Sequence, residues 1–100
     1  MVQKRILDTI KDYLEKEWGL DMYGPDVRFA YVIYFAYMQD FEDKIKTIDI
    51  IKGAYELAPK EKVSYESFQR SIYRALKNVT PNKSEYVKLI MQIAKQIEKL

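Results

Sequence analysis

The stretch TIDIIKGAYELA-PKEKV-SYESFQRSIYRALKN, residues 47–78, decides the fold of this chain. Its first part has apolar residues at intervals of three or four, which predicts an amphipathic helix over residues 47–58: Ile48, Ile51, Tyr55 and Ala58. Pro59 ends that helix, because proline cannot continue a helical hydrogen-bond ladder. Ser64 begins a second helix over residues 64–78, since its hydroxyl can accept a free N–H of the first turn. The pattern is therefore helix, short turn, helix.

Three further helices are expected, over residues 2–18, 25–41 and 81–100. Together with the unit at residues 47–78 they predict an all-α fold, a small orthogonal bundle of about five helices in one domain of 100 residues. Only three glycines and three prolines interrupt the chain, which leaves little room for β-hairpins. Gly53 lies inside a predicted helix at a cost of about 1 kcal/mol relative to alanine. A close helix crossing would explain a residue without a side chain there.

The predicted helix at residues 25–41 is apolar or aromatic on every side from Phe29 to Met38. A helix of this kind is buried on several faces, either inside its own fold or partly against a partner. We therefore expect a central core helix or, as the alternative, a dimer interface to which its tyrosines contribute. The ten-residue run is too short to span a bilayer, which takes about twenty.

The C-terminal helix carries a second regular pattern, with apolar residues spaced four, three, four and three apart. Such a heptad-like seam packs either on the body of the domain or on the same helix of a second subunit. The candidate dimer-interface residues are Tyr86, Ile90, Ile93, Ile97 and Leu100.

The helix-turn-helix layout at residues 47–78 is typical of proteins that place a second, short helix in the major groove of DNA. The residues on the outer side of that helix are the candidate DNA contacts: Ser64, Ser67, Arg70, Tyr73, Arg74 and Lys77. Lys60, Lys62 and Lys83 are candidate phosphate contacts. Glu66 would repel phosphate unless it faces a cytosine amino group. An ordinary solvated helix face with three positive charges is the alternative interpretation.

Charge is divided unevenly along the chain. Residues 1–50 hold seven Lys and Arg against ten Asp and Glu, a net charge of −3. Residues 51–100 hold ten against five, a net charge of +5. This asymmetry favours a polyanionic partner, although a chance distribution explains an excess of this size equally well.

Several function classes are disfavoured by composition. The chain has no cysteine and no histidine, which removes thiol nucleophiles, disulfides and the common zinc ligands. Asp40, Glu42, Asp43 and Asp49 lack the alternation and the glycine of an oxygen-ligand loop, so we expect a solvated corner and no metal site. We expect no enzyme activity, cofactor or small-molecule substrate. No signal peptide or membrane span is predicted, which favours a cytoplasmic protein.

A family resemblance joins several of these elements. Glu17-Trp18-Gly19-Leu20 precedes a Tyr-rich helix, and a later helix ends in Leu57-Ala58 before residues 64–76. This order resembles the DNA-binding effector domain of the sporulation master response regulator of endospore-forming bacteria. In the recognition helix of that family, an arginine and an isoleucine match Arg70 and Ile72.

The chain also departs from that family. Ser67 and Tyr73 stand where the family has arginines, so its particular DNA sequence is not carried over, and the last helix has no clear counterpart. The resemblance covers about residues 13–78 in pattern and implies an all-helical domain that pairs on DNA.

The sequence therefore predicts a sequence-specific duplex DNA-binding protein, a transcriptional regulator acting as a homodimer. The alternative is a protein-interaction module that uses the helix at residues 25–41 and the C-terminal stripe as its surfaces. An RNA-binding helical domain or an enzyme subunit is the third hypothesis.

Overall fold

A computed structural model describes residues 3–39, 45–59 and 63–100 of the chain. The helices in these ranges are α1 (Lys4–Trp18), α2 (Val27–Met38), α3 (Thr47–Leu57), α4 (Tyr65–Val79), the short 3-10 helix η1 (Lys83–Glu85) and α5 (Tyr86–Glu98). The described ranges contain no strand, so the all-α prediction is confirmed. None of the described helices is both long enough and apolar enough to cross a membrane.

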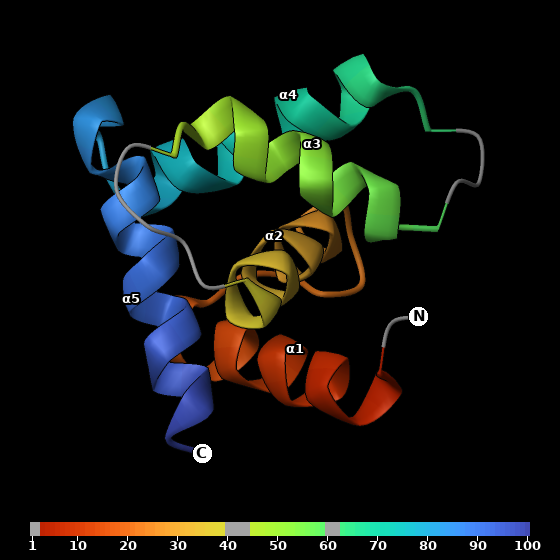
Figure 1. The fold of residues 1–100 in the computed structure, drawn as a ribbon, viewed down its shortest axis with the longest axis vertical. Coiled ribbons are helices and arrows are strands. Elements are labelled where there is room, and N and C mark those ends of the chain that lie inside the picture. The colour runs from red at the N-terminus through yellow and green to blue at the C-terminus, as the bar shows by residue number, and fades with distance from the viewer. Residues whose placement is uncertain (1–2, 40–44, 60–62) are drawn as a thin grey trace.

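Helix α2 lies at the centre of the molecule (Figure 1). It contacts α1, α3, α4 and α5, and half of its twelve residues are buried. The buried residues of α2 are Phe29, Ala30, Val32, Ile33, Tyr34 and Ala36. The prediction of a central core helix is confirmed, because an apolar surface on every side of a helix has to be covered on every side. Its bounds are narrower than the predicted 25–41.

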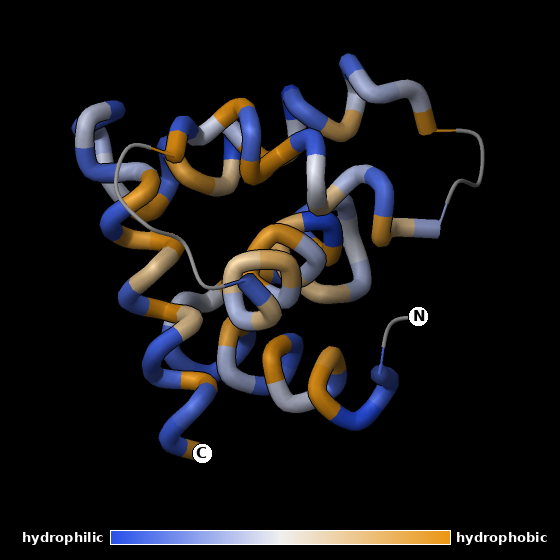
Figure 2. Tube along the Cα trace, in the orientation of Figure 1, coloured by the Kyte–Doolittle hydropathy of each residue, from blue (hydrophilic) through white to orange (hydrophobic). Residues whose placement is uncertain are grey.

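The outer helices each turn one apolar stripe toward this centre. Leu7, Ile10 and Leu14 are the buried residues of α1. Figure 2 shows hydrophobic residues recurring from turn to turn along α1 and α5, with hydrophilic residues between them. Gly19 ends α1 in the left-handed conformation, with φ 66°, which a glycine adopts without steric cost.

The heptad-like seam of α5 packs against the core of the same chain. Tyr86, Ile90, Ile93 and Ile97 are between 0% and 5% exposed and belong to the core, whereas Leu100 is 73% exposed. The assignment of these four residues to a dimer interface is therefore corrected. A heptad-like spacing only requires an apolar partner surface, and α2 supplies one.

The start of α5 also differs from the prediction of a single helix over residues 81–100. Asn82 accepts a hydrogen bond from the backbone N–H of Ser84 at 3.1 Å and caps the separate turn η1. The regular helix begins only at Tyr86. A short polar cap thus replaces the proline-led helix start that Pro81 suggested.

Helices α3 and α4 form the helical pair that the sequence predicted, and they contact each other. Ser64 caps α4 by accepting a hydrogen bond from the Ser67 backbone N–H at 3.1 Å, as predicted. Seven residues, 58–64, separate the two helices. That connection is longer than the three or four residues usual in a helix-turn-helix.

Gly53 marks the predicted close helix crossing. A Cβ atom added to Gly53 on α3 would overlap the ring of Phe35 on α2. The two helices therefore approach each other at a point where one of them has no side chain.

We expect Gly53→Ala to lower the free energy of unfolding by about 1–3 kcal/mol, the usual cost of overpacking, measured by urea denaturation followed by circular dichroism. The overlap with Phe35 outweighs the gain of about 1 kcal/mol in helix propensity. Lys52→Ala, at the exposed neighbouring position, is the matched control and should change stability little. In a Phe35→Leu background the alanine should become neutral or stabilising. A more stable Gly53→Ala protein would contradict this account of the crossing.

Candidate nucleic-acid interface

The basic groove is a surface hollow with a volume of about 620 Å³, which lies within the range of about 300–1,000 Å³ for small-molecule sites. Its lining residues come from α4, the connection after it, η1 and the first residue of α5: Arg70, Tyr73, Arg74, Lys77, Pro81, Lys83 and Tyr86. Four of these residues are cationic and none is acidic. The groove therefore concentrates positive charge on one side of a chain whose net charge is only +2.

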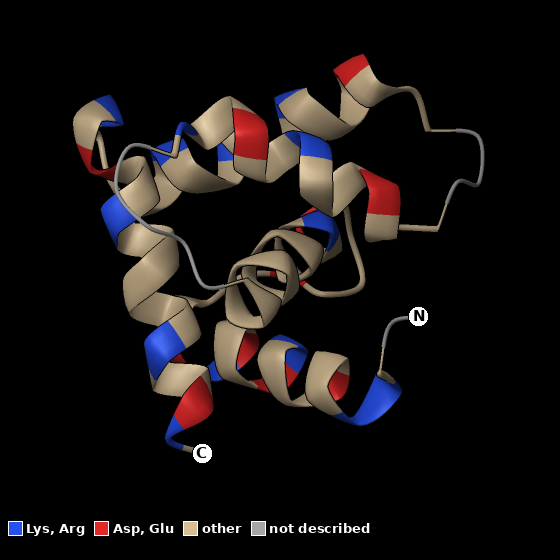
Figure 3. Cartoon of the chain, viewed as in Figure 1, with Lys and Arg blue, Asp and Glu red and all other residues tan. Residues whose placement is uncertain are grey.

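The periodicity of α4 places three of the four cations on one face. Phe68, Ile72, Ala75 and Leu76 are buried against the core. Arg70, Arg74 and Lys77 follow at intervals of four and three on another side, and all three are exposed. Figure 3 shows basic residues along α4 and an acidic residue in its first turn.

The cations of the groove are not neutralised by carboxylates within the described ranges. The ion pair found there joins Lys16 and Asp12 of α1 at 3.0 Å, far along the chain from α4. Unpaired cations that share one groove repel each other, and an anionic ligand would relieve that repulsion.

The groove also has an aromatic wall. The ring centroids of Tyr73 and Tyr86 lie 6.1 Å apart with an interplanar angle of 45°. Tyr86 is buried while Tyr73 is half-buried, so Tyr73 is the ring that a ligand can reach. The sequence had placed these residues in different sites, Tyr73 with the DNA contacts and Tyr86 in the dimer seam.

The predicted DNA contacts fall into three groups. Arg70, Tyr73, Arg74, Lys77 and Lys83 come together in the basic groove. Lys60 and Lys62 lie outside the described residues.

Two predicted contacts lie outside the groove, at the beginning of α4. The Ser64 hydroxyl accepts the Ser67 backbone N–H and donates to the Ser67 hydroxyl oxygen at 3.2 Å. Both side chains are therefore engaged in the helix cap. Glu66, which is exposed, adds a negative charge at the same end of α4.

Arg28 is a positioning residue that the sequence analysis missed. Its guanidinium reaches from α2 to α4, donating to the Ser71 hydroxyl and, at 3.5 Å, to the backbone carbonyl of Ser67. Ser71 in turn donates to the Ser67 carbonyl at 3.0 Å. The sequence did contain an indication of this role, because Arg28 is the one charged residue of the otherwise uncharged α2.

A cluster of rings lies where α3 and α4 meet. Tyr55 packs edge-on against Tyr65 at 5.4 Å and Phe68 at 5.3 Å, and its hydroxyl donates to the Val63 carbonyl at 2.8 Å. The Tyr65 hydroxyl is shielded from solvent and has no hydrogen-bond partner within the described ranges. Desolvation raises the pKa of Tyr65, and Tyr73 and Asp49 raise it further.

Comparison with family models, curated proteins and solved structures found no match to this chain. The resemblance to the sporulation regulator therefore rests on the residues quoted for it.

We expect Tyr65→Phe to raise the free energy of unfolding by up to about 1 kcal/mol at neutral pH, because it removes a buried hydroxyl that has no partner among the described residues. The pKa of Tyr65 is higher in the folded chain than the value of about 10 in the unfolded chain. Its ionisation therefore favours the unfolded state, and stability is lost as pH rises from about 10 through the folded pKa. Denaturant titrations on both sides of that pH should show a smaller alkaline loss in Tyr65→Phe. Tyr23→Phe, at an exposed tyrosine, is the control, and equal losses in both variants would contradict the assignment.

Proposed function

We propose that this chain is a double-stranded DNA-binding protein that engages the phosphate backbone through the basic groove and reads bases with α4. The observation that supports this most directly is the basic groove itself, with four cations and no acidic residue in its lining. Binding to DNA is dominated by neutralisation of phosphates, so a surface of this charge is its first requirement.

The spacing of the cations suits a nucleic-acid strand. At about 1.5 Å of helix per residue, Arg70 and Lys77 are separated by about 10 Å along α4. That length is comparable to the axial rise of about three phosphates in one DNA strand. Lysines hold phosphates as point charges, whereas arginines can also bind guanine through two hydrogen bonds. Arg70 and Arg74 are accordingly our candidates for base recognition.

The α3–α4 pair serves in this proposal as a helix-turn-helix of unusual form. Its connection is long, and its cations lie in the middle and last turns of α4, while the first turn carries Glu66. Helices of this class usually contact bases with their N-terminal residues. We therefore propose a docking in which α4 approaches DNA with its central and C-terminal part.

A role in transcription regulation and the pairing of two copies on DNA follow from the family resemblance, and both remain part of the proposal. Two copies on a two-fold site would place their α4 helices about 34 Å apart. The surface between the copies has to differ from the α5 seam, because Tyr86, Ile90, Ile93 and Ile97 are buried within one chain.

The alternative, a protein-interaction module, is less favoured, because the two surfaces proposed for it are largely used for packing within the fold. Half of the residues of α2, and Tyr86, Ile90, Ile93 and Ile97 of the α5 seam, are buried in the fold. The large hydrophobic residues that are exposed, Tyr23, Met38 and Leu100, come from three separate elements of the described chain.

We expect Arg70→Ala combined with Arg74→Ala to weaken binding to duplex DNA at least tenfold, that is by about 1.4 kcal/mol or more. The slope of log affinity against log salt should change little, because contacts to bases are lost while the phosphate contacts of Lys77 and Lys83 remain. Fluorescence anisotropy with a labelled duplex, between about 50 mM and 200 mM salt, measures both quantities.

The matched control is Arg5→Ala combined with Lys52→Ala, which removes two exposed cations outside the groove. This variant has the same net charge as the groove variant, so it separates local binding from the overall charge. The proposal would be contradicted if the affinity for duplex DNA did not depend on salt concentration. It would also be contradicted if both double variants lost the same affinity.

A further inference from the structure

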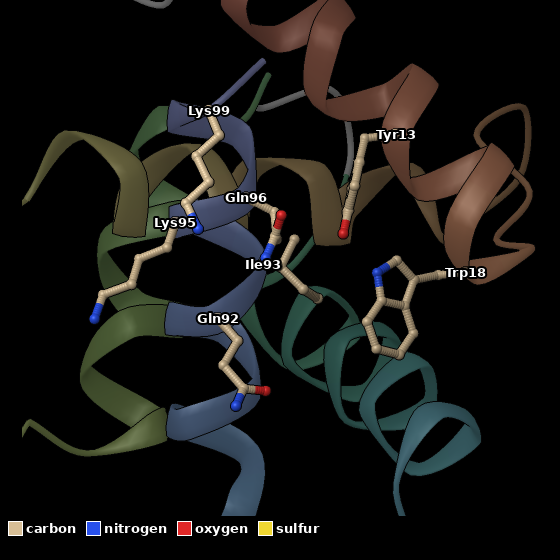
Figure 4. A pocket seen from close by; sticks show the side chains of 7 residues that line it. All are labelled: Tyr13, Trp18, Gln92, Ile93, Lys95, Gln96 and Lys99. Carbon is tan, nitrogen blue, oxygen red and sulfur yellow. The ribbon is translucent and has the colours of Figure 1, made fainter.

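A second hollow lies between α1 and α5, and it shares no lining residue with the basic groove. We call it the donor pocket, and its volume is about 350 Å³. It is lined by Tyr13 and Trp18 of α1 and by Gln92, Ile93, Lys95, Gln96 and Lys99 from the last turns of α5 and its cap (Figure 4). This volume is at the lower end of the range of about 300–1,000 Å³ for small-molecule sites.

The indole of Trp18 is the unusual feature of this pocket. Its Nε1 atom is shielded from solvent and has no hydrogen-bond partner within the described ranges. An indole N–H can only donate, so it needs an acceptor. A buried donor without one costs free energy, which a ligand with a suitable acceptor would recover.

The remaining lining has the charge that suits an anionic acceptor. Lys95 and Lys99 bring two ammonium groups, and no carboxylate lines the pocket. In Figure 4, Ile93 and Gln96 project from α5 on the side of Tyr13 and Trp18, and Lys99 runs back along α5 toward Gln96. Lys95 extends away from Trp18, which leaves Lys99 as the cation closer to the pocket.

Two helix ends disfavour an anion in the donor pocket. Helices α1 and α5 both end here, and the C-terminal end of a helix carries partial negative charge. In α1 the Leu14 carbonyl is already occupied by the N–H groups of Gly19 and Leu20. A purely ionic ligand would therefore be held weakly, and burial of an apolar part has to contribute.

We propose that the donor pocket binds a small monocarboxylic acid with an apolar body. The carboxylate accepts the Trp18 indole N–H and pairs with the Lys99 ammonium, a charge-assisted arrangement. The apolar body lies against Ile93 and the aromatic rings of Tyr13 and Trp18. Because the indole N–H is shielded from solvent, side chains of the pocket lining have to shift for the acid to reach it. This proposal does not depend on DNA binding.

The single tryptophan of the chain makes the test direct, because the protein has one indole N–H resonance. We titrate the ¹⁵N-labelled full chain with hexanoate, hexan-1-ol and acetate and follow that resonance. Hexanoate should shift it downfield with saturation. Its dissociation constant should be at least about tenfold lower than those of hexan-1-ol, which lacks the charge, and acetate, which lacks the apolar body.

Lys99→Met should weaken hexanoate binding about tenfold and leave hexan-1-ol unchanged. Lys88→Met, at an exposed position of α5 outside the pocket, is the control and should bind hexanoate as the unmodified chain does. Trp18→Phe, followed through the Ile93 amide, should also weaken hexanoate binding. A shift that never saturates, equal affinity for hexanoate and hexan-1-ol, or equal behaviour of Lys99→Met and Lys88→Met would overturn the proposal.

Discussion

The apolar surface of α2 is the constraint on which the rest of the structure depends. Twelve residues, Val27–Met38, form a helix with a single charged side chain, and such a helix cannot leave any broad side in water. Each large side chain that it buries, such as Phe29 or Ile33, contributes about 1.5–3 kcal/mol. Four helices therefore pack around it, and each presents its one apolar stripe. The orientation of every outer helix follows from this enclosure.

The same enclosure positions the basic groove. The buried stripe of α4 fixes its rotation, so that Arg70, Arg74 and Lys77 are turned outward. Arg28 adds a polar tie from α2 to the Ser71 hydroxyl, which a rotated or shifted α4 would break. Packing of α5 on α2 places the buried ring of Tyr86 next to the half-buried ring of Tyr73. Apolar contacts in the core thus fix the positions of the charged residues of the groove.

The sequence predicted the helices well because helical period and apolar spacing are local properties. It also predicted that Arg70, Arg74 and Lys77 share a face, since their spacing of four and three is set by the helix alone. It could not predict that Tyr86 joins them, because that depends on the path of the chain between α4 and α5. The Asn82 cap and the turn η1 lie in that connection.

Two features of the sequence were each open to two interpretations, for a common physical reason. An apolar seam shows that a helix packs on something, and its period is the same whether the partner is its own domain or a second chain. A serine at the start of a helix is equally ambiguous, because a hydroxyl that can bind DNA can also cap the helix. The Ile90 seam and the Ser64–Ser67 pair were both resolved by contacts within the chain. Only three-dimensional neighbours distinguish these uses.

The two proposed sites lie toward opposite ends of α5, and this placement separates their chemistry. The N-terminal end of a helix carries partial positive charge and the C-terminal end partial negative charge. At the basic groove the C-terminal end of α4 and the N-terminal end of α5 carry opposite partial charges, so the four cations decide the field and charge alone favours a polyanion there. At the donor pocket the helix ends oppose the field of Lys95 and Lys99, so charge alone is insufficient and burial against Ile93 has to supply the difference. A phosphate-rich strand would therefore favour the groove, whereas a small acid with an apolar body would favour the pocket.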